Sequence, residues 1–175
     1  YLPDAALESL EISPSEVVEA VEAALVARAE RRLQTAPKSV IRPGDGRYVM
    51  STLAAGDHGY VVVKQVSVCP DNVERDLPTI NGAIMVLDSE TGLLRAVMGA
   101  NWITAHRTAA LSAVAARRLA DPGSSTIAFV GCGVQARSHL RAFSELFPLK
   151  HVFAVGRSAG TVEDFLDHAR GSGFE

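Results

Sequence analysis

The sequence has 175 residues, 47% hydrophobic and 21% charged, a composition typical of a folded globular protein with a real core. Its formal net charge of −3 argues against general attraction to nucleic acid or an anionic membrane, and no apolar run reaches the ~18 residues that a membrane span needs. The two cysteines form no C-x-x-C pair and the five histidines have no metal-ligand spacing, so we expect a reduced, cytoplasmic protein without a metal site.

The first part of the chain has the pattern of a helix followed by an antiparallel sheet. Ser13-Pro14-Ser15-Glu16 is typical of a helix start, because its first and last residues can cap each other's backbone amides, and apolar residues at helical spacing extend to about Leu33. Lys38, Val40 and Arg42 then share one face of an extended segment. We expect further strands at residues 47–52, 60–68, 79–87 and 93–99, separated by glycine-containing turns.

The second part alternates strands and helices. Residues 102–120 form an alanine-rich helical pattern that Asp121-Pro122-Gly123-Ser124-Ser125 ends. A strand, a helix, a strand and a helix are then expected at residues 126–130, 134–147, 151–155 and 161–170, an alternation typical of a parallel sheet. The expected fold class is therefore α/β. An α+β domain for substrate binding and dimerisation would span residues 1–120, and an incomplete Rossmann (doubly wound) NAD(P)-binding domain would span residues 121–175.

A glycine-rich turn follows the first strand of this second domain. The sequence GCGVQA at residues 131–136 is a G-x-G-x-x-A motif in the strand–turn–helix context that dinucleotide binding requires. The first glycine allows the tight turn, the second leaves room for a pyrophosphate, and the alanine lets helix and strand pack closely. The helix N-terminus also favours an anion. The cofactor-binding residues expected here are Gly131, Gly133, Val134, Gln135 and Ala136; the alternative is a tight turn that binds nothing.

The tip of the second strand indicates which cofactor binds. NAD-binding versions place an acidic residue there to bond the ribose 2′-hydroxyl, whereas this sequence has Gly156-Arg157-Ser158. Arg157 can pair with a 2′-phosphate and Ser158 can donate a hydrogen bond to it. We therefore predict NADP(H) in preference to NAD(H), with a solvated loop arginine as the alternative for Arg157.

The Rossmann pattern is incomplete. Two strands and two helices make up only part of a doubly wound sheet, and the sequence stops at Glu175, where a third strand would begin. We therefore expect the sequence to be part of a longer protein whose remaining nucleotide-binding elements carry further catalytic groups.

Two basic residues stand in unusual places. Lys64 lies in the middle of a valine-rich strand, where burying its charge is costly without an anion. Arg107 lies in the first turn of the expected alanine-rich helix, the unfavourable end of the helix dipole for a cation. A bound carboxylate would compensate both charges. The alternatives are an outward-facing lysine and an arginine that only caps a carbonyl.

The sequence resembles the ornithine cyclodeaminase/μ-crystallin family. The resemblance is carried, in this order, by VVVKQVSVCPDN, LPTINGAIMVLDSETG, ITAHRTAALSAVAARRLA and IAFVGCGVQARSHLRAF, and it is strongest from Tyr60 to Ala142. It implies a homodimer whose subunits have an α+β domain and a Rossmann domain. Members include ornithine cyclodeaminases, alanine dehydrogenases, ketimine and pyrroline-carboxylate reductases and the thyroid-hormone-binding μ-crystallins.

The resemblance also implies roles for particular residues. Lys64 and Arg107 would hold the α-carboxylate of a small amino or imino acid, assisted by Lys38. Thr79 and Thr108 would touch the nicotinamide half or the phosphates of the cofactor, and we count Arg107 with them. Residues 131–136 would cradle the pyrophosphate. The residues facing the adenosine ribose would be Gly156, Arg157 and Ser158.

Three functions are consistent with these features. The leading expectation is an NAD(P)-dependent oxidoreductase of a small 2-amino or 2-imino acid, of the ketimine reductase or amino acid dehydrogenase type. The alternatives are an ornithine cyclodeaminase-type lyase that uses NAD catalytically and a non-catalytic binder of NADP and a small ligand. The lyase is weakened because cyclodeaminases of the family carry a glutamate where this sequence has Tyr48, two residues before Met50, and because their catalytic aspartate would lie beyond Glu175.

Overall fold

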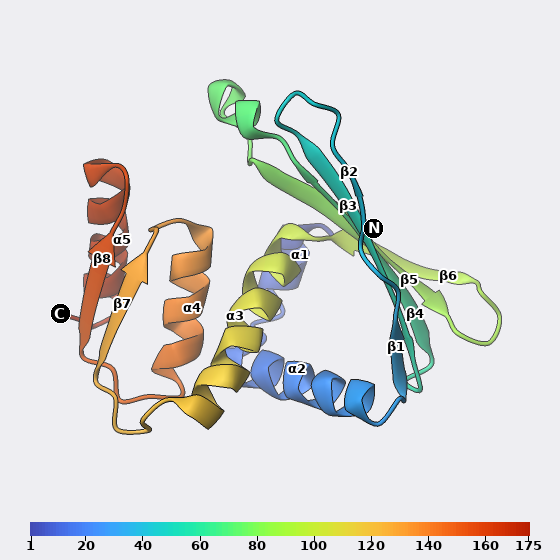
Figure 1. Ribbon diagram of the computed structural model, residues 1–175, viewed down its shortest axis with the longest axis horizontal. Helices are drawn as coiled ribbons and strands as arrows, with labels where there is room; N and C mark the ends of the chain where they lie inside the picture. The colour runs from blue at the N-terminus through green and yellow to red at the C-terminus, as the bar shows by residue number, and fades with distance from the viewer. The chain divides into compact units, whose positions relative to one another are not determined.

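A computed structural model describes all residues from 1 to 175 (Figure 1). The chain consists of two compact units. Unit 1 comprises residues 1–11 and 23–104, and unit 2 comprises residues 12–22 and 105–175. Two helices belong partly to each unit: α2 (Pro14–Ala29) and α3 (Asn101–Leu119). No helix in the structure combines the length and the apolar character that crossing a bilayer requires.

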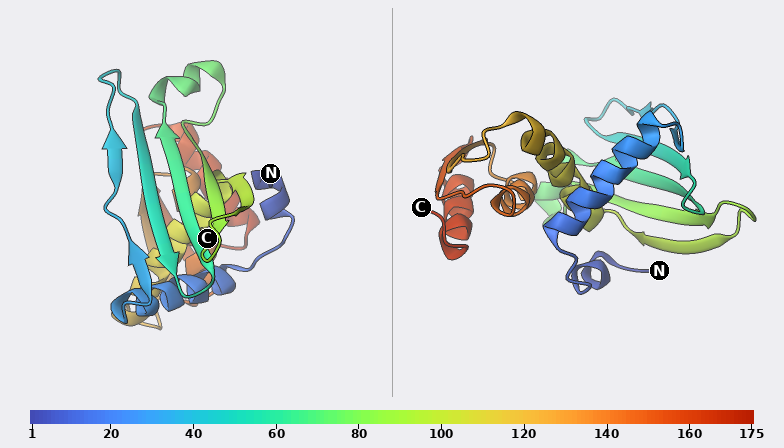
Figure 2. Two further views of the ribbon diagram at one scale, coloured as in Figure 1. Left: turned by 90° about the vertical axis from the view of Figure 1, so that its right-hand side faces the viewer. Right: turned by 90° about the horizontal axis from the view of Figure 1, so that it is seen from below.

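Unit 1 is built on a six-stranded sheet in which every pair of neighbouring strands is antiparallel. The strands are β1 (Leu33–Thr35), β2 (Ser39–Ile41), β3 (Tyr48–Gly56), β4 (Tyr60–Val68), β5 (Ile80–Asp88) and β6 (Leu94–Gly99). Their order is β1-β3-β4-β5-β6, and β2 also pairs with β3; Figure 2 shows them side by side. The predicted antiparallel sheet is therefore confirmed, although β3 extends beyond its predicted end.

The first long helix begins where the sequence predicts. The Glu16 amide donates to Ser13 Oγ at 3.3 Å, and the Ser13 amide donates to Glu16 Oε2 at 2.9 Å. The helix ends at Ala29 rather than near Leu33, because Arg31 takes a left-handed φ of 63° and Leu33 opens β1. The structure also contains a short helix and a 3₁₀ turn that the sequence analysis did not predict: α1 (Asp4–Glu8) and η1 (Pro70–Arg75).

The strand register places Lys64 on the face of the sheet that carries the core. Lys64 lies opposite Ile84, and directly opposed residues of antiparallel strands point to the same face. Val66 and Ile84 are buried there together with Ala100, and Ile103 in the first turn of α3 packs against them. The sheet therefore buries this face of its centre against the start of α3.

The other face of the sheet carries a row of apolar side chains. Leu53, Val63, Met85 and Val97 lie opposite one another on four successive strands. Leu53 is 43% exposed and Met85 is 42% exposed. This row is thus apolar and partly open to solvent.

In unit 2, the second half of α3 packs against the first half of α2. Val18 of α2 is buried among Ala109, Ala113 and Val114 of α3. At the end of α3, Arg117 and Arg118 both form ion pairs with Glu22 of α2. Because of this packing the compact units divide inside α3 rather than at residue 121, where we expected the boundary; a functional division at residue 121 stays a prediction.

The rest of unit 2 is the start of a Rossmann domain. Strands β7 (Thr126–Val130) and β8 (His151–Val155) are parallel, as predicted. Helix α4 (Val134–Ser144) ends before its predicted limit, and α5 (Ala159–Gly171) follows β8. The helices cover one face of the strand pair, where Phe165 and Leu140 are fully buried. On the opposite face Phe153 remains 62% exposed.

Candidate functional site

The glycine turn between β7 and α4 has the backbone geometry of a phosphate site. Gly131 has a φ of +98°, which residues with a side chain rarely adopt. Its amide donates to the Val155 carbonyl at 2.7 Å, so the turn is tied to the tip of β8. A Cβ atom added to Gly133 would meet no atom within 4 Å. The turn therefore leaves open space in front of the helix.

The start of α4 presents free backbone donors to that space. The first helical hydrogen bond runs from the Ala136 amide to the Gly133 carbonyl at 3.0 Å, so the amides of Val134 and Gln135 precede it. The first turn contains no acidic residue that would compete for them. Ala136 is buried against the strands, as close packing of helix and strand requires. Such a helix end suits a pyrophosphate.

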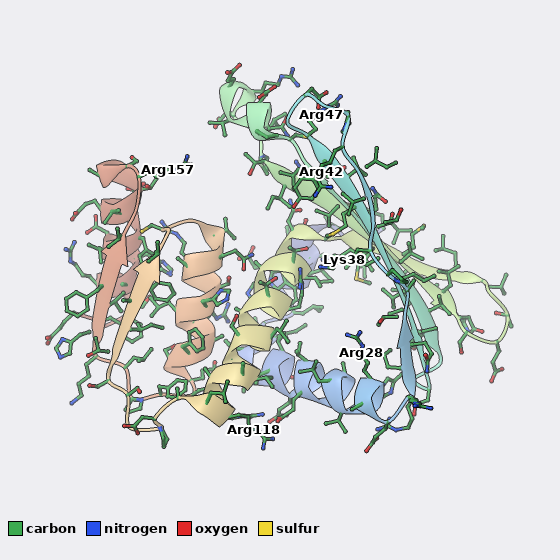
Figure 3. All side chains as sticks on the ribbon, in the orientation of Figure 1. Arg28, Lys38, Arg42, Arg47, Arg118 and Arg157 are labelled. Carbon is green, nitrogen blue, oxygen red and sulfur yellow. The ribbon has the colours of Figure 1, made fainter.

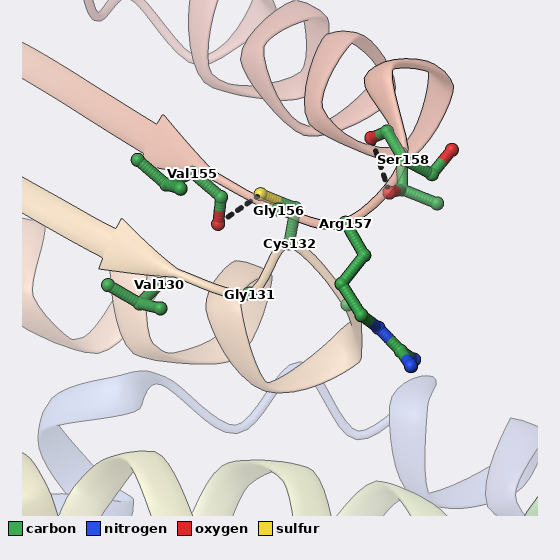
Figure 4. Close-up of a pocket in the computed structure, with 9 residues that line it drawn as sticks. Val130, Gly131, Cys132, Val155, Gly156, Arg157 and Ser158 are labelled. Atoms are coloured by element: carbon green, nitrogen blue, oxygen red, sulfur yellow. Dashed lines mark hydrogen bonds between the residues drawn. The ribbon is translucent and has the colours of Figure 1, made fainter.

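A cavity of about 810 Å³ lies over this turn (Figure 4). Its walls are the ends of β7 and β8, the glycine turn and the first residues after β8. This volume lies within the range of small-molecule and cofactor sites. The described walls contain one charged side chain, that of Arg157, and no carboxylate.

At the tip of β8, the backbone of Gly156 packs closely against Val162 and Cys132. A Cβ atom on Gly156 would lie 2.9 Å from Val162 Cγ2 and 3.5 Å from Cys132 Sγ, so a side chain there would force Val162 to shift. Arg157 is exposed, and its side chain extends past the glycine turn (Figure 4). Ser158 lines the same cavity, as does Thr161, whose Oγ1 donates to the Ser158 carbonyl at 3.0 Å.

Cys132 occupies the first variable position of the motif, and its contact with β8 was not predicted from the sequence. Its thiol donates a hydrogen bond to the Val155 carbonyl across a distance of 3.8 Å, and the residue is 8% exposed. The glycine turn is therefore attached to β8 through both Gly131 and Cys132. The G-x-G-x-x-A pattern leaves this position free, so the motif alone gives no signal for the contact.

A second cavity, of about 460 Å³, lies in unit 1 on the Lys64 face of the sheet. Three cationic side chains line it: Lys64 from β4, Lys38 from the segment before β2, and Arg28 from the last turn of α2. No carboxylate lines it. Figure 3 shows Arg28 and Lys38 among the side chains of this part of the chain. An arrangement of cations without acids suits an anionic ligand.

Lys64 is positioned by the first turn of α3. Its Nζ donates a hydrogen bond to Thr104 Oγ1 at 3.2 Å. The lysine is partly buried, between Val62 and Val66 on the core-bearing face. The structure thus brings Lys64 and Lys38 to one cavity. Two further residues were not predicted from the sequence: Arg28, which lines the cavity, and Thr104, which bonds Lys64. Neither carries a local signal, since each reaches its partners only through the fold.

The remaining residues assigned from the sequence are distributed over both units. Thr79 directly precedes β5 in unit 1, and its carbonyl accepts a hydrogen bond from the Cys69 amide at 2.8 Å. Arg107 and Thr108 belong to unit 2. Arg107 lies in the second turn of α3, not the first, because the helix already begins at Asn101.

Arg107 keeps one feature of an anion-binding residue. No ion pair of the structure involves it, and desolvation by its surroundings lowers the pKa of its guanidinium although part of the side chain is exposed. An arginine stays charged despite such a shift. The helix dipole acts mainly within the first turn, so the dipole effect expected from the sequence does not apply to Arg107 in the second turn.

Comparison with known proteins places these features in a family context. The family model described as ornithine cyclodeaminase/mu-crystallin matches residues 5–175. An L-lysine cyclodeaminase from Streptomyces rapamycinicus is 43% identical over 106 residues, which are 60% of this chain and 31% of that protein.

Two solved structures have nearly the same fold as the whole chain. A Thermococcus litoralis Δ1-pyrroline-2-carboxylate reductase in complex with NADH and L-proline has a TM-score of 0.95 and 29% identity, over 99% of this chain and 55% of that one. An archaeal alanine dehydrogenase dimer with bound NAD has a TM-score of 0.93 and 32% identity, over 99% of this chain and 53% of that one. The chain therefore spans about half the length of these solved relatives.

Proposed function

Because this chain belongs to the ornithine cyclodeaminase/mu-crystallin family, we propose that the whole protein is an NAD(P)-dependent oxidoreductase of a small 2-amino or 2-imino acid. The observation that carries the proposal is the glycine turn at residues 131–133, which is open in front of α4 and bordered by free backbone amides. The solved relatives that bind NADH with L-proline, or NAD, support the same chemistry.

The residues of unit 2 fit a dinucleotide. The amides of Val134 and Gln135 would donate to the pyrophosphate, in the space that Gly133 leaves open. Arg157 and Ser158 would bind a ribose 2′-phosphate, which favours NADP(H). When bound, the cofactor supplies the hydride for an imine or accepts it from an amine.

The cations that line the unit 1 cavity fit the acid part of the substrate. We assign the α-carboxylate to Lys64 and Lys38, and, on the family resemblance, to Arg107. These side chains would orient the α-carbon, which takes up the hydride in the reductive direction while the imine nitrogen takes up a proton. Thr79 and Thr108 stay assigned to the cofactor by the same resemblance.

A lyase remains the second candidate because of the 43% identity to an L-lysine cyclodeaminase. A lyase oxidises its amino acid, loses ammonia on ring closure and then returns the hydride, so the cofactor undergoes no net change. A non-catalytic binder of NADP and a small ligand would be a third candidate.

One experiment on the whole protein separates these functions. NADPH oxidation would be followed with 2-oxo acids plus ammonium and with cyclic imino acids, and ammonia release would be followed with ornithine and lysine in the presence of NAD+ or NADP+. Stoichiometric NADPH oxidation supports the oxidoreductase. Ammonia release without net formation of NADH or NADPH supports the lyase, and saturable cofactor binding without either reaction supports the binder.

We further propose that the protein is a homodimer in the cytoplasm. The apolar row that includes Leu53 and Met85 is an unoccupied face on which a second copy can pack, and the alanine dehydrogenase relative is a dimer. Cys69 and Cys132 are both free thiols, consistent with a reducing compartment.

A further inference from the structure

We propose that the substrate carries a second acidic group, so that the site takes a 2-imino or 2-amino dicarboxylic acid, and that Arg28 binds the distal carboxylate. The inference rests on the proposed function and names its substrate class. Its starting point is the charge of the unit 1 cavity, which is lined by three cations and no carboxylate.

The spacing of the two lysines allows them to serve one carboxylate. Thr52 of β3 lies opposite Lys64 of β4, and Lys38 directly precedes the pair formed by Ser39 and Ser51 on the other side of β3. The lysine backbones therefore stand two strand spacings apart, about 10 Å, on one face of the sheet. Flexible side chains facing one cavity across such a distance can converge on the α-carboxylate.

Arg28 enters the cavity from a different element. It lies in the last turn of α2 (labelled in Figure 3), and it lines the same cavity as the two lysines. A guanidinium can bind a carboxylate through two parallel hydrogen bonds, which an ammonium cannot do. Arg28 is therefore better suited than either lysine to bind a second carboxylate of the substrate.

The surroundings do not already neutralise Arg28. Nearby Arg32 pairs with Glu30 and Asp57, whereas none of the ion pairs of the structure involves Arg28 or Lys38. The C-terminal end of a helix favours a cation, which accounts for an arginine at this position but not for its place in a cavity with two lysines. A monocarboxylate bound by the two lysines would leave Arg28 without a counter-charge, whereas the second carboxylate of a dicarboxylate would supply one.

The test uses pairs of substrates that differ only at the distal end. In the whole protein with NADPH and ammonium, 2-oxoglutarate would be compared with 2-oxopentanoate, and oxaloacetate with 2-oxobutanoate. Within each pair a terminal carboxylate replaces a methyl group. We expect kcat/KM to be at least about tenfold higher for the dicarboxylate, the difference that one charge-assisted contact provides.

The variant that isolates the contact is Arg28→Met, which keeps most of the stem and removes the charge. It should lower kcat/KM for the dicarboxylates at least about tenfold and change that for the monocarboxylates less than about twofold. Arg28→Lys should retain part of the preference. Arg31→Met is the matched control, since Arg31 lies outside the cavity and close to Arg28 in the chain.

Binding of the same four oxo acids in the presence of NADP+, measured by calorimetry, separates this inference from the proposed function. If no compound is reduced, the proposed function fails, and the calorimetric preference still decides the question of the second carboxylate. The inference is overturned if the parent protein prefers the monocarboxylates or shows no preference. It is equally overturned if Arg28→Met weakens both members of a pair alike, or neither.

Discussion

Lys64 Nζ donates a hydrogen bond to Thr104 Oγ1 at 3.2 Å, which links the middle of β4 to the first turn of α3. The same lysine lines a cavity without acids and lies on the face of the sheet that buries Val66. A lysine ammonium group in such a cavity can bind an anion well when its position is fixed, and the hydrogen bond to the threonine hydroxyl restrains it.

Replacing Lys64 with Met should therefore impair substrate binding without weakening the fold. The substitution keeps the apolar stem and removes the ammonium group, so we expect the apparent KM to rise at least about tenfold. Thr104→Val, which replaces the hydroxyl with a methyl group of similar size, should raise KM by a smaller factor of about 2–10. Steady-state kinetics and thermal melting would be measured together. A lower melting temperature with unchanged KM would mean that Lys64 is a structural residue.

Replacing Gly133 with Val should abolish cofactor binding and leave the fold intact. Its φ of −88° suits any residue, and its Cβ position has no neighbour within 4 Å, so the added side chain costs little in the free protein. The same side chain would occupy the space of the pyrophosphate. Fluorescence titration with NADPH measures the effect, and cofactor binding equal to that of the parent would show that the turn is not the phosphate site.

Gly156 provides the contrasting control for that variant. A Cβ atom there would lie 2.9 Å from Val162 Cγ2, so Gly156→Ala should disturb the packing of α5 itself and lower the melting temperature. Of these two substitutions in one cavity, Gly133→Val should therefore affect cofactor binding and Gly156→Ala should affect the stability of the fold.

Arg157 should determine the preference between cofactors. Arg157→Met removes the guanidinium that would pair with the 2′-phosphate, so NADPH affinity should fall about tenfold or more while NADH affinity changes little. Titrating both cofactors with the parent and the variant tests this. A parent that binds NADH as tightly as NADPH, or a variant that loses both equally, would rule out this role for Arg157.

The features that the sequence predicted well are local ones. The glycine turn is encoded by consecutive residues, so its backbone geometry could be predicted from GCGVQA. The two parallel strands before and after α4 in the chain follow from their short apolar runs. The unusual surroundings of Lys64 could also be predicted, because a charge within a valine-rich strand departs from the apolar pattern, whereas its role in substrate binding stays a prediction.

The features that the sequence did not predict depend on tertiary packing. In the sequence, Arg28 has the pattern of a solvated residue near a helix end; only the fold places it in the cavity that Lys38 and Lys64 line. The division of the chain inside α3 arises because Ala109 and Ala113 pack on α2, and nothing in an alanine-rich helix indicates where its partner changes. Short elements such as β1 are stabilised by pairing with β3 and carry too few residues for a periodic signal.

We predict that the face of the unit 1 sheet opposite Lys64 forms the dimer interface. Leu53, Val63, Met85 and Val97 form an apolar row across β3 to β6, and two of them remain more than 40% exposed. Exposed apolar side chains that lie side by side on a sheet, rather than scattered singly, are typical of a surface that another protein covers. In a homodimer with twofold symmetry the same row from each copy would meet its counterpart. Met85→Glu would place two carboxylates in that contact, so the whole protein should change from dimer to monomer in light scattering while its circular dichroism stays unchanged. Val73→Glu, at an exposed position of η1, adds the same charge away from the row and should remain dimeric. A Met85→Glu protein that stays a dimer would place the subunit interface elsewhere on the molecule.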